Sequence, residues 1–254
     1  MPSHEELREI TREAIKRLSV LEESGQGFLY GMKLPKETHS GNAGIETDLD
    51  VTMRRTGKSA ESGLAELERR AKRCTKCALS KDRKNVVFSD GSTKSGIVFI
   101  GEAPGREEDI KGKPFVGEAG KLLTRIIIKG MGLCRDDVYI ANVLKCRPPF
   151  NRDPDSDEIK ACVPILIQQL ELVKPKMICA LGKFAAQFLT ESKEPISALR
   201  GKVFSYRGIP VIPTFHPAAI LRNPGLKRSV WEDIQLIMKE CGIPMPIRGE
   251  MVTF

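Results

Sequence analysis

Hydrophobic positions follow two different rhythms along this chain of 254 residues. Residues 3–24 predict an amphipathic helix, because Ser3 and Glu6 have the spacing of a capping box and apolar residues recur every three or four positions. Residues 25–62 are rich in Gly, Ser, Thr and scattered charges without a sustained period, which predicts a flexible connector. A second short helix is expected over residues 64–73.

The pattern changes after residue 77, where short apolar runs rich in β-branched residues alternate with longer helical segments. Strands that are separated by a helix in each gap are typical of a parallel sheet covered on both faces. We therefore predict an α/β fold, a three-layer sandwich with a central four-stranded parallel sheet and helices on both faces. The expected strands are residues 97–100, 138–141, 177–181 and 211–215, and the expected helices are residues 120–128, 155–173 and 183–189.

Charge and composition divide the sequence in the same way. The 41 Lys and Arg residues exceed the 33 Asp and Glu residues by 8, and residues 1–73 contribute nothing to this excess. A basic domain favours an acidic partner such as nucleic acid. We predict an N-terminal helix and linker of unknown function over residues 1–65 and an α/β domain over residues 66–254.

The sequence contains no apolar stretch of the roughly 20 residues that a membrane helix needs, and its first residues are too polar and acidic for a secretory signal. We therefore expect a cytoplasmic, monomeric protein without a membrane partner.

Chemistry-bearing residues follow each predicted strand. Gly101-Glu-Ala-Pro-Gly105 comes after the first strand, Asn142 after the second, Gly182 after the third and His216 after the fourth. In a parallel sheet ligands bind in the crevice at the carboxyl ends of the strands, so these residues are expected at one site. The glycine-rich turn has the spacing of neither a dinucleotide fingerprint nor a P-loop, and a plain loop is an equal alternative.

Phe115 and His216 each have a structural and a functional interpretation. An aromatic residue between prolines and glycines is more often part of a core than a stacking platform. A lone histidine is usually structural, but His216 opens a loop that carries Arg222, Lys227 and Arg228, which raises the expectation of function.

All seven cysteines lie in the basic part of the sequence. Cys74-x-x-Cys77 can direct two sulfurs at one ion or cluster, and Cys146 and Cys162 complete a set of four. The long gap between the pairs fits a compact zinc ribbon poorly, and the spacing leaves an iron-sulfur cluster and a structural zinc open. Cys134, Cys179 and Cys241 are expected to be buried small residues.

Several motifs in order resemble those of the family 4 uracil-DNA glycosylases, over roughly residues 70–240. They are Gly101-Glu-Ala-Pro-Gly105, Lys113-Pro-Phe-Val-Gly-Glu-Ala-Gly120, Asn142-Val-Leu-Lys-Cys-Arg-Pro-Pro149, Cys162, and His216-Pro-Ala with Leu221-Arg-Asn-Pro224. The resemblance implies that uracil is flipped out of single- or double-stranded DNA and its N-glycosidic bond is hydrolysed.

The resemblance also implies roles for individual residues. A 4Fe-4S cluster would be held by Cys74, Cys77, Cys146 and Cys162. Gly101, Glu102, Ala103, Phe115, Asn142 and His216 would bind uracil, with Glu102, Asn142 and His216 in catalysis. Leu221 would act as a wedge in the vacated base stack, and Arg222, Lys227 and Arg228, with Lys145 and Arg147, would contact phosphates.

The residue that positions water is left open. Ala103 stands where superfamily members with an aspartate in this motif use it to position water, so Glu102, Glu108 and Asp109 are the candidates. Two other functions also stay open: a lyase that uses a lysine as Schiff base, and a cluster-containing nucleic-acid-binding module without catalysis, to which the N-terminal extension would add a protein partner. A zinc deaminase is not expected, because no His-x-Glu motif occurs together with a Pro-Cys-x-x-Cys motif.

Overall fold

The computed structural model describes residues 59–245. All of the described residues belong to one compact unit. The helix predicted over residues 3–24 and most of the predicted connector lie outside the described residues. The predicted boundary after residue 65 falls inside a described helix, α3 (Ala60–Lys72).

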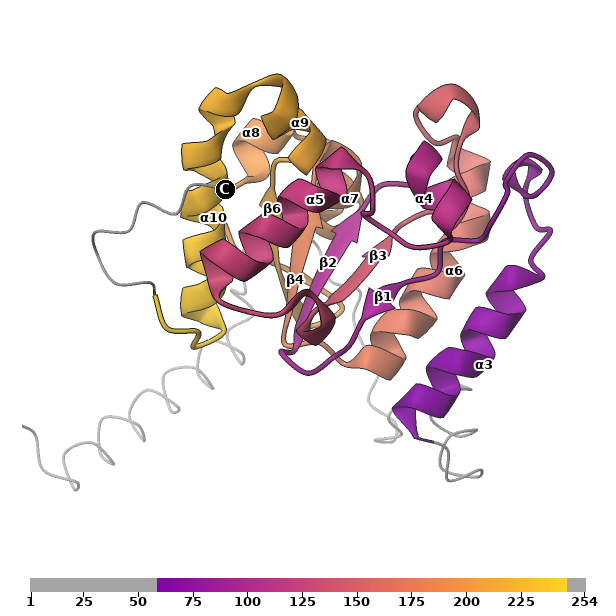
Figure 1. The fold of residues 1–254 in the computed structure, drawn as a ribbon, viewed down its shortest axis with the longest axis horizontal. Helices are drawn as coiled ribbons and strands as arrows, with labels where there is room; N and C mark the ends of the chain where they lie inside the picture. Colours follow the sequence, from indigo (N-terminus) through magenta and orange to yellow (C-terminus); the bar gives the residue numbers. More distant parts are fainter. Residues whose placement is uncertain (1–58, 246–254) are drawn as a thin grey trace, which may run out of the picture. The chain divides into compact units, whose positions relative to one another are not determined.

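A six-stranded sheet forms the centre of the described unit (Figure 1). Its order is β1-β3-β2-β4-β6-β5, in which the four middle strands are parallel and the two edge strands are antiparallel to their neighbours. The strands are β1 (Asp90–Gly91), β2 (Ile97–Gly101), β3 (Tyr139–Asn142), β4 (Met177–Leu181), β5 (Phe204–Tyr206) and β6 (Ile209–Thr214).

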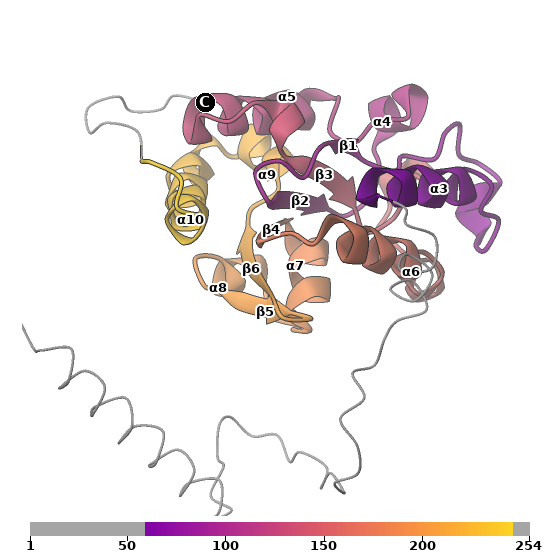
Figure 2. The same ribbon diagram turned by 90° about the horizontal axis from the view of Figure 1, so that it is seen from below.

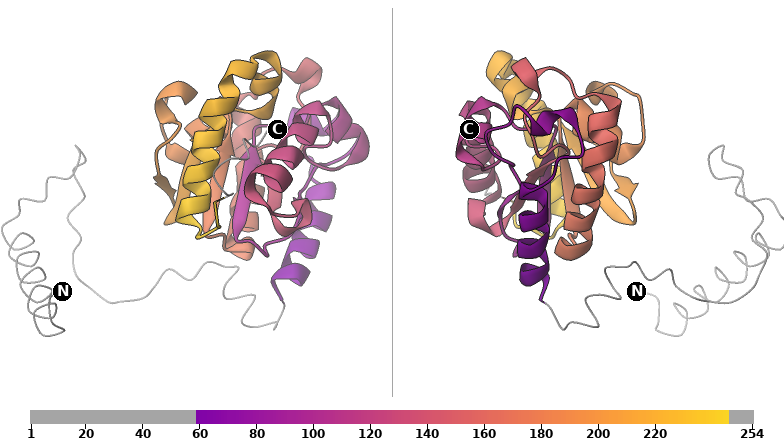
Figure 3. Two further views of the ribbon diagram at one scale, coloured as in Figure 1. Left: turned by 60° about the vertical axis from the view of Figure 1, so that its left-hand side comes forward. Right: turned by 90° about the vertical axis from the view of Figure 1, so that its right-hand side faces the viewer.

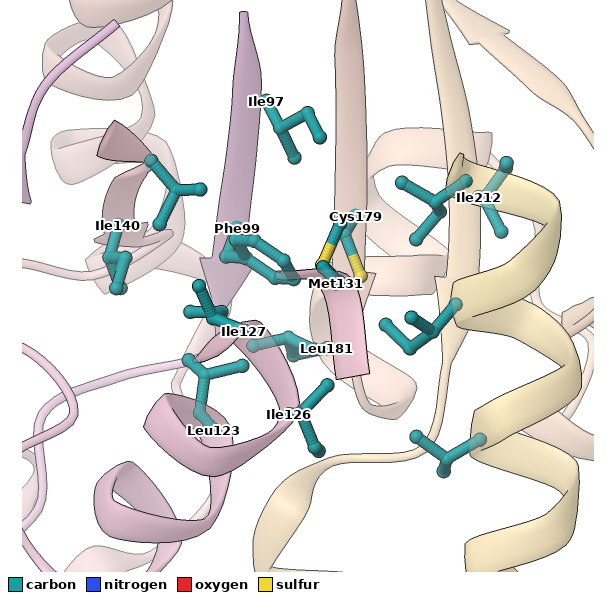
Figure 4. Close-up of a cluster of buried hydrophobic side chains, with 14 of the residues drawn as sticks. Ile97, Phe99, Leu123, Ile126, Ile127, Met131, Ile140, Cys179, Leu181 and Ile212 are labelled. Carbon is teal, nitrogen blue, oxygen red and sulfur yellow. The ribbon is translucent and has the colours of Figure 1, made fainter. Parts of the chain in front are cut away.

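Helices cover both faces of this sheet (Figure 2). One buried cluster joins α5 and α10 to one face, and a second joins α6, α7 and α8 to the other face. Figure 4 shows the first cluster, in which Phe99 and Cys179 of the sheet meet Leu123 and Ile127. The helices are α4 (Arg106–Lys111), α5 (Glu118–Arg125), α6 (Ser156–Val173), α7 (Lys183–Thr190), α8 (Ile196–Leu199), α9 (Pro217–Arg222) and α10 (Lys227–Glu240).

Helix α3 packs outside this sandwich, beside α6 (Figure 3). Its buried residues Leu67 and Ala71 contact a third apolar cluster that contains Leu144, Cys146 and Cys162. The segment that carries the first cysteine pair therefore continues directly from a helix that is anchored to the domain.

The predicted α/β class and its parallel strands are confirmed, but the sheet has six strands in the described part of the protein rather than four. The two additional strands have two and three residues, which is too short for an alternating pattern to reveal. Helix α5 continues as a π-helical turn over Ile126–Gly130. None of the described helices is long and apolar enough to cross a membrane.

Candidate active site

A pocket of about 330 Å³ opens at the carboxyl ends of the parallel strands. The segments that follow β2, β3 and β6 supply its walls, together with the loop before α5. It is lined by Glu102, Ala103, Pro104, Gly105, Glu108, Phe115, Ala119, Asn142, Pro148, Asn151, Arg152, His216, Ala218 and Arg222. Three of the four segments predicted at this crevice supply its walls, whereas Gly182 does not line the pocket and lies behind His216, whose Cβ would be 2.9 Å from a Cβ at Gly182.

The last residues of β2 and β3 pair directly, which brings Gly101 next to Asn142. The pairing continues beyond the strands, because the Leu144 N–H donates to the Glu102 carbonyl oxygen at 2.9 Å. A Cβ atom at Gly101 would lie 2.6 Å from Phe115 Cζ and still closer to Asn142 Oδ1. Glycine is required here because the ring and the carboxamide both pack against its backbone.

The loop that carries Phe115 is fixed by Glu108 of α4. One carboxylate oxygen of Glu108 accepts hydrogen bonds from the backbone N–H groups of Val116 and Gly117, both at 2.9 Å. Phe115 has a φ of 52°, a left-handed conformation that is strained for a bulky residue. A Cβ atom at Gly120 would collide with the Phe115 backbone, so this glycine permits the close approach of α5.

Asn142 is 2% exposed, and its carboxamide lies in the wall of the pocket. Its backbone oxygen accepts a hydrogen bond from Lys145 Nζ at 2.7 Å. Within residues 59–245, no hydrogen bond engages the oxygen or the nitrogen of its carboxamide. In the pocket wall, this carboxamide is available to pair with a ligand.

His216 is held in one orientation at the start of α9. Its Nδ1 atom accepts a hydrogen bond from the Ala218 N–H at 3.1 Å, so the neutral ring carries its proton on Nε2. Burial, with a smaller contribution from the charge of Arg222 and against the opposite effect of Glu108, lowers the pKa of His216 to about 4. Its ring centroid lies 5.5 Å from that of Phe115. At neutral pH His216 therefore offers a neutral N–H donor beside the Phe115 ring.

Glu102 is the carboxylate with the most perturbed pKa in the pocket. Burial, with a smaller contribution from Asp153 and against the opposite effect of Lys183, raises its pKa from 4.5 to about 7. A carboxyl group with a pKa near 7 exchanges a proton readily at neutral pH, which suits a general base.

The four cysteines of the predicted metal set line a second, small hollow between α3 and α6. Two N–H groups are directed at their sulfurs: Arg83 Nη1 lies 3.2 Å from Cys146 Sγ, and the Lys145 backbone nitrogen lies 3.3 Å from Cys162 Sγ. Burial raises the pKa of Cys162 to about 11 and also raises that of Cys146. No group of three or more His, Cys, Asp or Glu side chains in the described ranges is placed to hold a metal ion.

Comparison with known proteins identifies the family. The model of the uracil DNA glycosylase superfamily matches residues 88–235. A type-4 uracil-DNA glycosylase from Saccharolobus solfataricus is 48% identical over 184 residues, which cover 69% of this protein and 85% of the relative. The protein belongs to the type-4 family of the uracil-DNA glycosylase superfamily.

Further type-4 uracil-DNA glycosylases are similar to the same extent. The protein from Archaeoglobus fulgidus is 46% identical over 191 residues, covering 72% of the present sequence and 96% of the relative. The protein from Thermotoga maritima is 48% identical over 170 residues, which cover 65% of the present sequence and 88% of the relative. The resemblance found in the sequence motifs is thereby confirmed, and the superfamily match includes every residue that lines the pocket.

The residues predicted to contact DNA do not all lie at the pocket. Arg222 lines the pocket, whereas Leu221, Lys227 and Arg228 lie outside its lining and are exposed. Arg228 also forms an ion pair with Glu232 at 3.4 Å.

Three expectations from the sequence are wrong. Lys145 is 1% exposed and bonded to the Asn142 carbonyl, so it does not reach a phosphate. Asp109 accepts hydrogen bonds from the Lys84 and Asn85 backbone N–H groups and does not line the pocket, so it does not position water. Cys134 is exposed rather than buried, while Cys179 is buried and Cys241 is partly so.

Sequence reasoning missed one wall of the pocket, formed by Pro148, Asn151 and Arg152. Arg152 is held by Glu158 through two hydrogen bonds, at 2.6 and 2.9 Å. The available signal was the Asn-Arg-Asp-Pro run beyond Pro149, because it continues a loop that starts at a strand end. The second missed residue, Arg83, has no sequence motif and is found only from its contact with Cys146.

Proposed function

We propose that this protein is a monofunctional uracil-DNA glycosylase, which flips uracil out of DNA and hydrolyses its N-glycosidic bond to leave an abasic site. One observation carries the proposal: the carboxamide of Asn142 and the Nε2–H of His216 lie in one pocket beside the ring of Phe115. The carboxamide matches the polar edge of a flipped uracil, the Nε2–H matches the O2 atom on which negative charge develops, and the Phe115 ring matches the flat face.

Asn142 would read the base. Uracil presents an acceptor at O4 and a donor at N3, which pair with the NH₂ and C=O of a carboxamide. Cytosine reverses this pattern, and each unmet buried group typically costs about 1–3 kcal/mol. Because Asn142 is buried and its Oδ1 lies against the backbone of Gly101, the carboxamide has little room to turn and accept cytosine.

His216 would stabilise the leaving group. Cleavage leaves negative charge on the uracil ring, and a fixed N–H donor at O2 stabilises this charge without having to reorganise. Since the pKa of His216 is about 4, the residue acts as a neutral hydrogen-bond donor rather than as a general acid at neutral pH. Phe115 would stack against the ring, and backbone N–H groups of the turn that begins at Gly101 would assist.

Glu102 would bind and deprotonate the attacking water. Its pKa of about 7 leaves a substantial fraction of the carboxylate form at neutral pH. Glu108 also lines the pocket, but one of its oxygens already accepts two hydrogen bonds from the Phe115 loop. Ala103 lines the wall and would help to limit the space beside the base.

A 4Fe-4S cluster would be held by Cys74, Cys77, Cys146 and Cys162. The chemistry of the hollow fits this group, because four cysteines line it and two N–H groups already point at sulfur, as they do around thiolate-bound clusters. The cluster would supply a structural cross-link between α3, the segment after β3, and α6.

Exposed residues beside the pocket would hold the DNA. Leu221 is 44% exposed and would act as a wedge in the vacated stack, with Arg222, Lys227 and Arg228 on phosphates. No lysine lines the pocket in the described part of the protein, so a Schiff-base lyase is not supported. A binding module without catalysis is not favoured either, because the protein belongs to a family of glycosylases. The monomeric state, the cytoplasmic location and a protein partner for residues 1–65 stay predictions.

The test is release of free uracil from a uracil-containing duplex by purified protein and by the variant Asn142→Asp. The carboxylate cannot donate to O4, so we expect the rate to fall by roughly 10- to 100-fold. Thermal unfolding of the variant controls for loss of structure. Undiminished release would show that Asn142 does not read the base, and no release by the unaltered protein would reject the glycosylase itself.

A further inference from the structure

Phe150 is the most exposed large apolar side chain in the described part of the protein. It is 98% exposed, and it adopts a left-handed backbone conformation with φ 55°. An aromatic side chain gains nothing for folding in such a position, since it buries almost no surface and its backbone is strained. A residue with this combination is a candidate for contact with a ligand.

The turn that carries Phe150 is rigid. Pro148 and Pro149 restrict its entry, and Arg147 Nε donates to Asn151 Oδ1 at 2.7 Å across it. On its far side Arg152 is fixed to Glu158 at the start of α6. The aromatic ring is therefore presented at the tip of a turn that is ordered before any ligand binds.

This turn stands at the rim of the base pocket. Pro148, two residues before Phe150, and Asn151, directly after it, line the pocket. The turn follows β3, whereas Leu221 follows β6, and β2 and β4 separate these strands in the sheet. Phe150 and Leu221 are therefore two exposed apolar residues on opposite sides of the same opening. In Figure 1 the loop between β3 and α6 and helix α9 both stand at the upper end of the sheet.

We propose that Phe150 stacks on the nucleobase next to the flipped uridine and supports the DNA from the side opposite Leu221. This inference rests on the proposed function, because it requires uracil-containing DNA as the ligand. A flat, unpaired ring suits a base that has lost its stacking neighbour, and base stacking on an aromatic side chain is independent of sequence. Arg222 in the pocket wall and Arg147 in the turn add positive charge for the phosphates on either side.

The experiment compares Phe150→Ala and Phe150→Trp with the control Ile128→Ala. Ile128 is also exposed, at 52%, but it lies in the π-helical turn that follows α5 and does not line the base pocket. The probe is a duplex with 2′-fluorouridine, whose glycosidic bond resists hydrolysis, and with 2-aminopurine placed in turn on either side of it. Binding and 2-aminopurine fluorescence are measured, and uracil release is measured on an ordinary uracil-containing duplex.

We expect Phe150→Ala to weaken binding and slow release by roughly tenfold, and to raise the 2-aminopurine fluorescence of the complex on one side of the uridine. Phe150→Trp should retain both properties, and Ile128→Ala should match the unaltered protein. Unchanged binding and fluorescence in Phe150→Ala would overturn the proposal. A loss of self-association by this variant, with DNA binding unchanged, would also overturn it and assign the ring to a protein contact. Absence of uracil release by the unaltered protein would instead reject the proposed function.

Discussion

The base pocket and the cysteine hollow share the short segment 142–146 at the end of β3, but the polar groups in the two sites have opposite environments. Asn142 begins this segment in the pocket wall, and Cys146 ends it in the hollow. In the pocket, the Asn142 carboxamide and the His216 Nε2–H are available to a ligand. In the hollow, the N–H groups of Arg83 and Lys145 are already directed at sulfur atoms.

The difference indicates that the pocket binds and releases a ligand, whereas the hollow keeps a fixed set of contacts. Polar groups left without protein partners favour a ligand that enters, pairs with them and leaves, whereas satisfied groups hold a fixed arrangement. Lys145 joins the two, because its backbone N–H contacts Cys162 and its ammonium group bonds to the Asn142 carbonyl. The order of the hollow therefore contributes to the orientation of the base-reading residue.

The largest effect that would test this contrast is expected for His216→Ala. Loss of one preorganised donor to O2 of the leaving uracil should lower the rate of uracil release by roughly 100- to 1,000-fold. The free energy of unfolding should fall by only about 1 kcal/mol, the typical cost of losing a helix cap, because the hydrogen bond from the Ala218 N–H is lost. Uracil release and calorimetry of the same sample check both expectations. Equal losses of activity and stability would show that the pocket, like the hollow, serves structure.

The reverse result is expected in the hollow for Cys162→Ser. Replacement of a buried sulfur that accepts the Lys145 N–H should lower the free energy of unfolding by about 1–3 kcal/mol even before any loss of bound iron. Thermal unfolding, iron content and visible absorbance measure the effect. Cys134→Ser is the matched control, since Cys134 is exposed, and it should change none of these properties. A stable, iron-loaded Cys162→Ser protein would contradict the proposed ligand set.

A smaller effect concerns proton exchange in the pocket. Because the pKa of Glu102 is about 7 and its carboxylate form is the proposed base, the rate of uracil release should rise with pH through about 7. Asp153→Asn removes a charge that raises this pKa, so the rise should move to lower pH. Lys183→Met removes a charge that lowers it, so the rise should move to higher pH.

Two controls accompany these pH profiles. Glu102→Gln should abolish the rise, and Glu107→Gln should leave it in place, because Glu107 lies on α4 and pairs with Lys111. Profiles that do not respond to either neighbouring charge would remove Glu102 from the role of base.

The same contrast explains what the sequence could and could not predict. The four parallel strands were predictable because each is a run of buried apolar residues, and their carboxyl ends placed Glu102, Asn142 and His216 in one crevice. The environment of Lys145 was not predictable, because a lysine beside a strand end looks exposed until its carbonyl partner is known. The wall formed by Asn151 and Arg152 was missed for a similar reason, since a loop's path depends on distant contacts such as that with Glu158.

The smallest effect tests whether DNA contacts only the side of the protein that carries the pocket. Lys227→Ala should weaken binding to any duplex and reduce the slope of log affinity against log salt concentration by about 0.9, the change expected for one lost phosphate contact. Lys76→Ala, at the edge of the cysteine hollow, should leave the slope unchanged. Arg228→Ala should have a weaker effect than Lys227→Ala, because Glu232 already offsets part of the Arg228 charge. Titrations at several salt concentrations measure all three, and an equal change of slope for Lys76→Ala would place the hollow, too, against the DNA backbone.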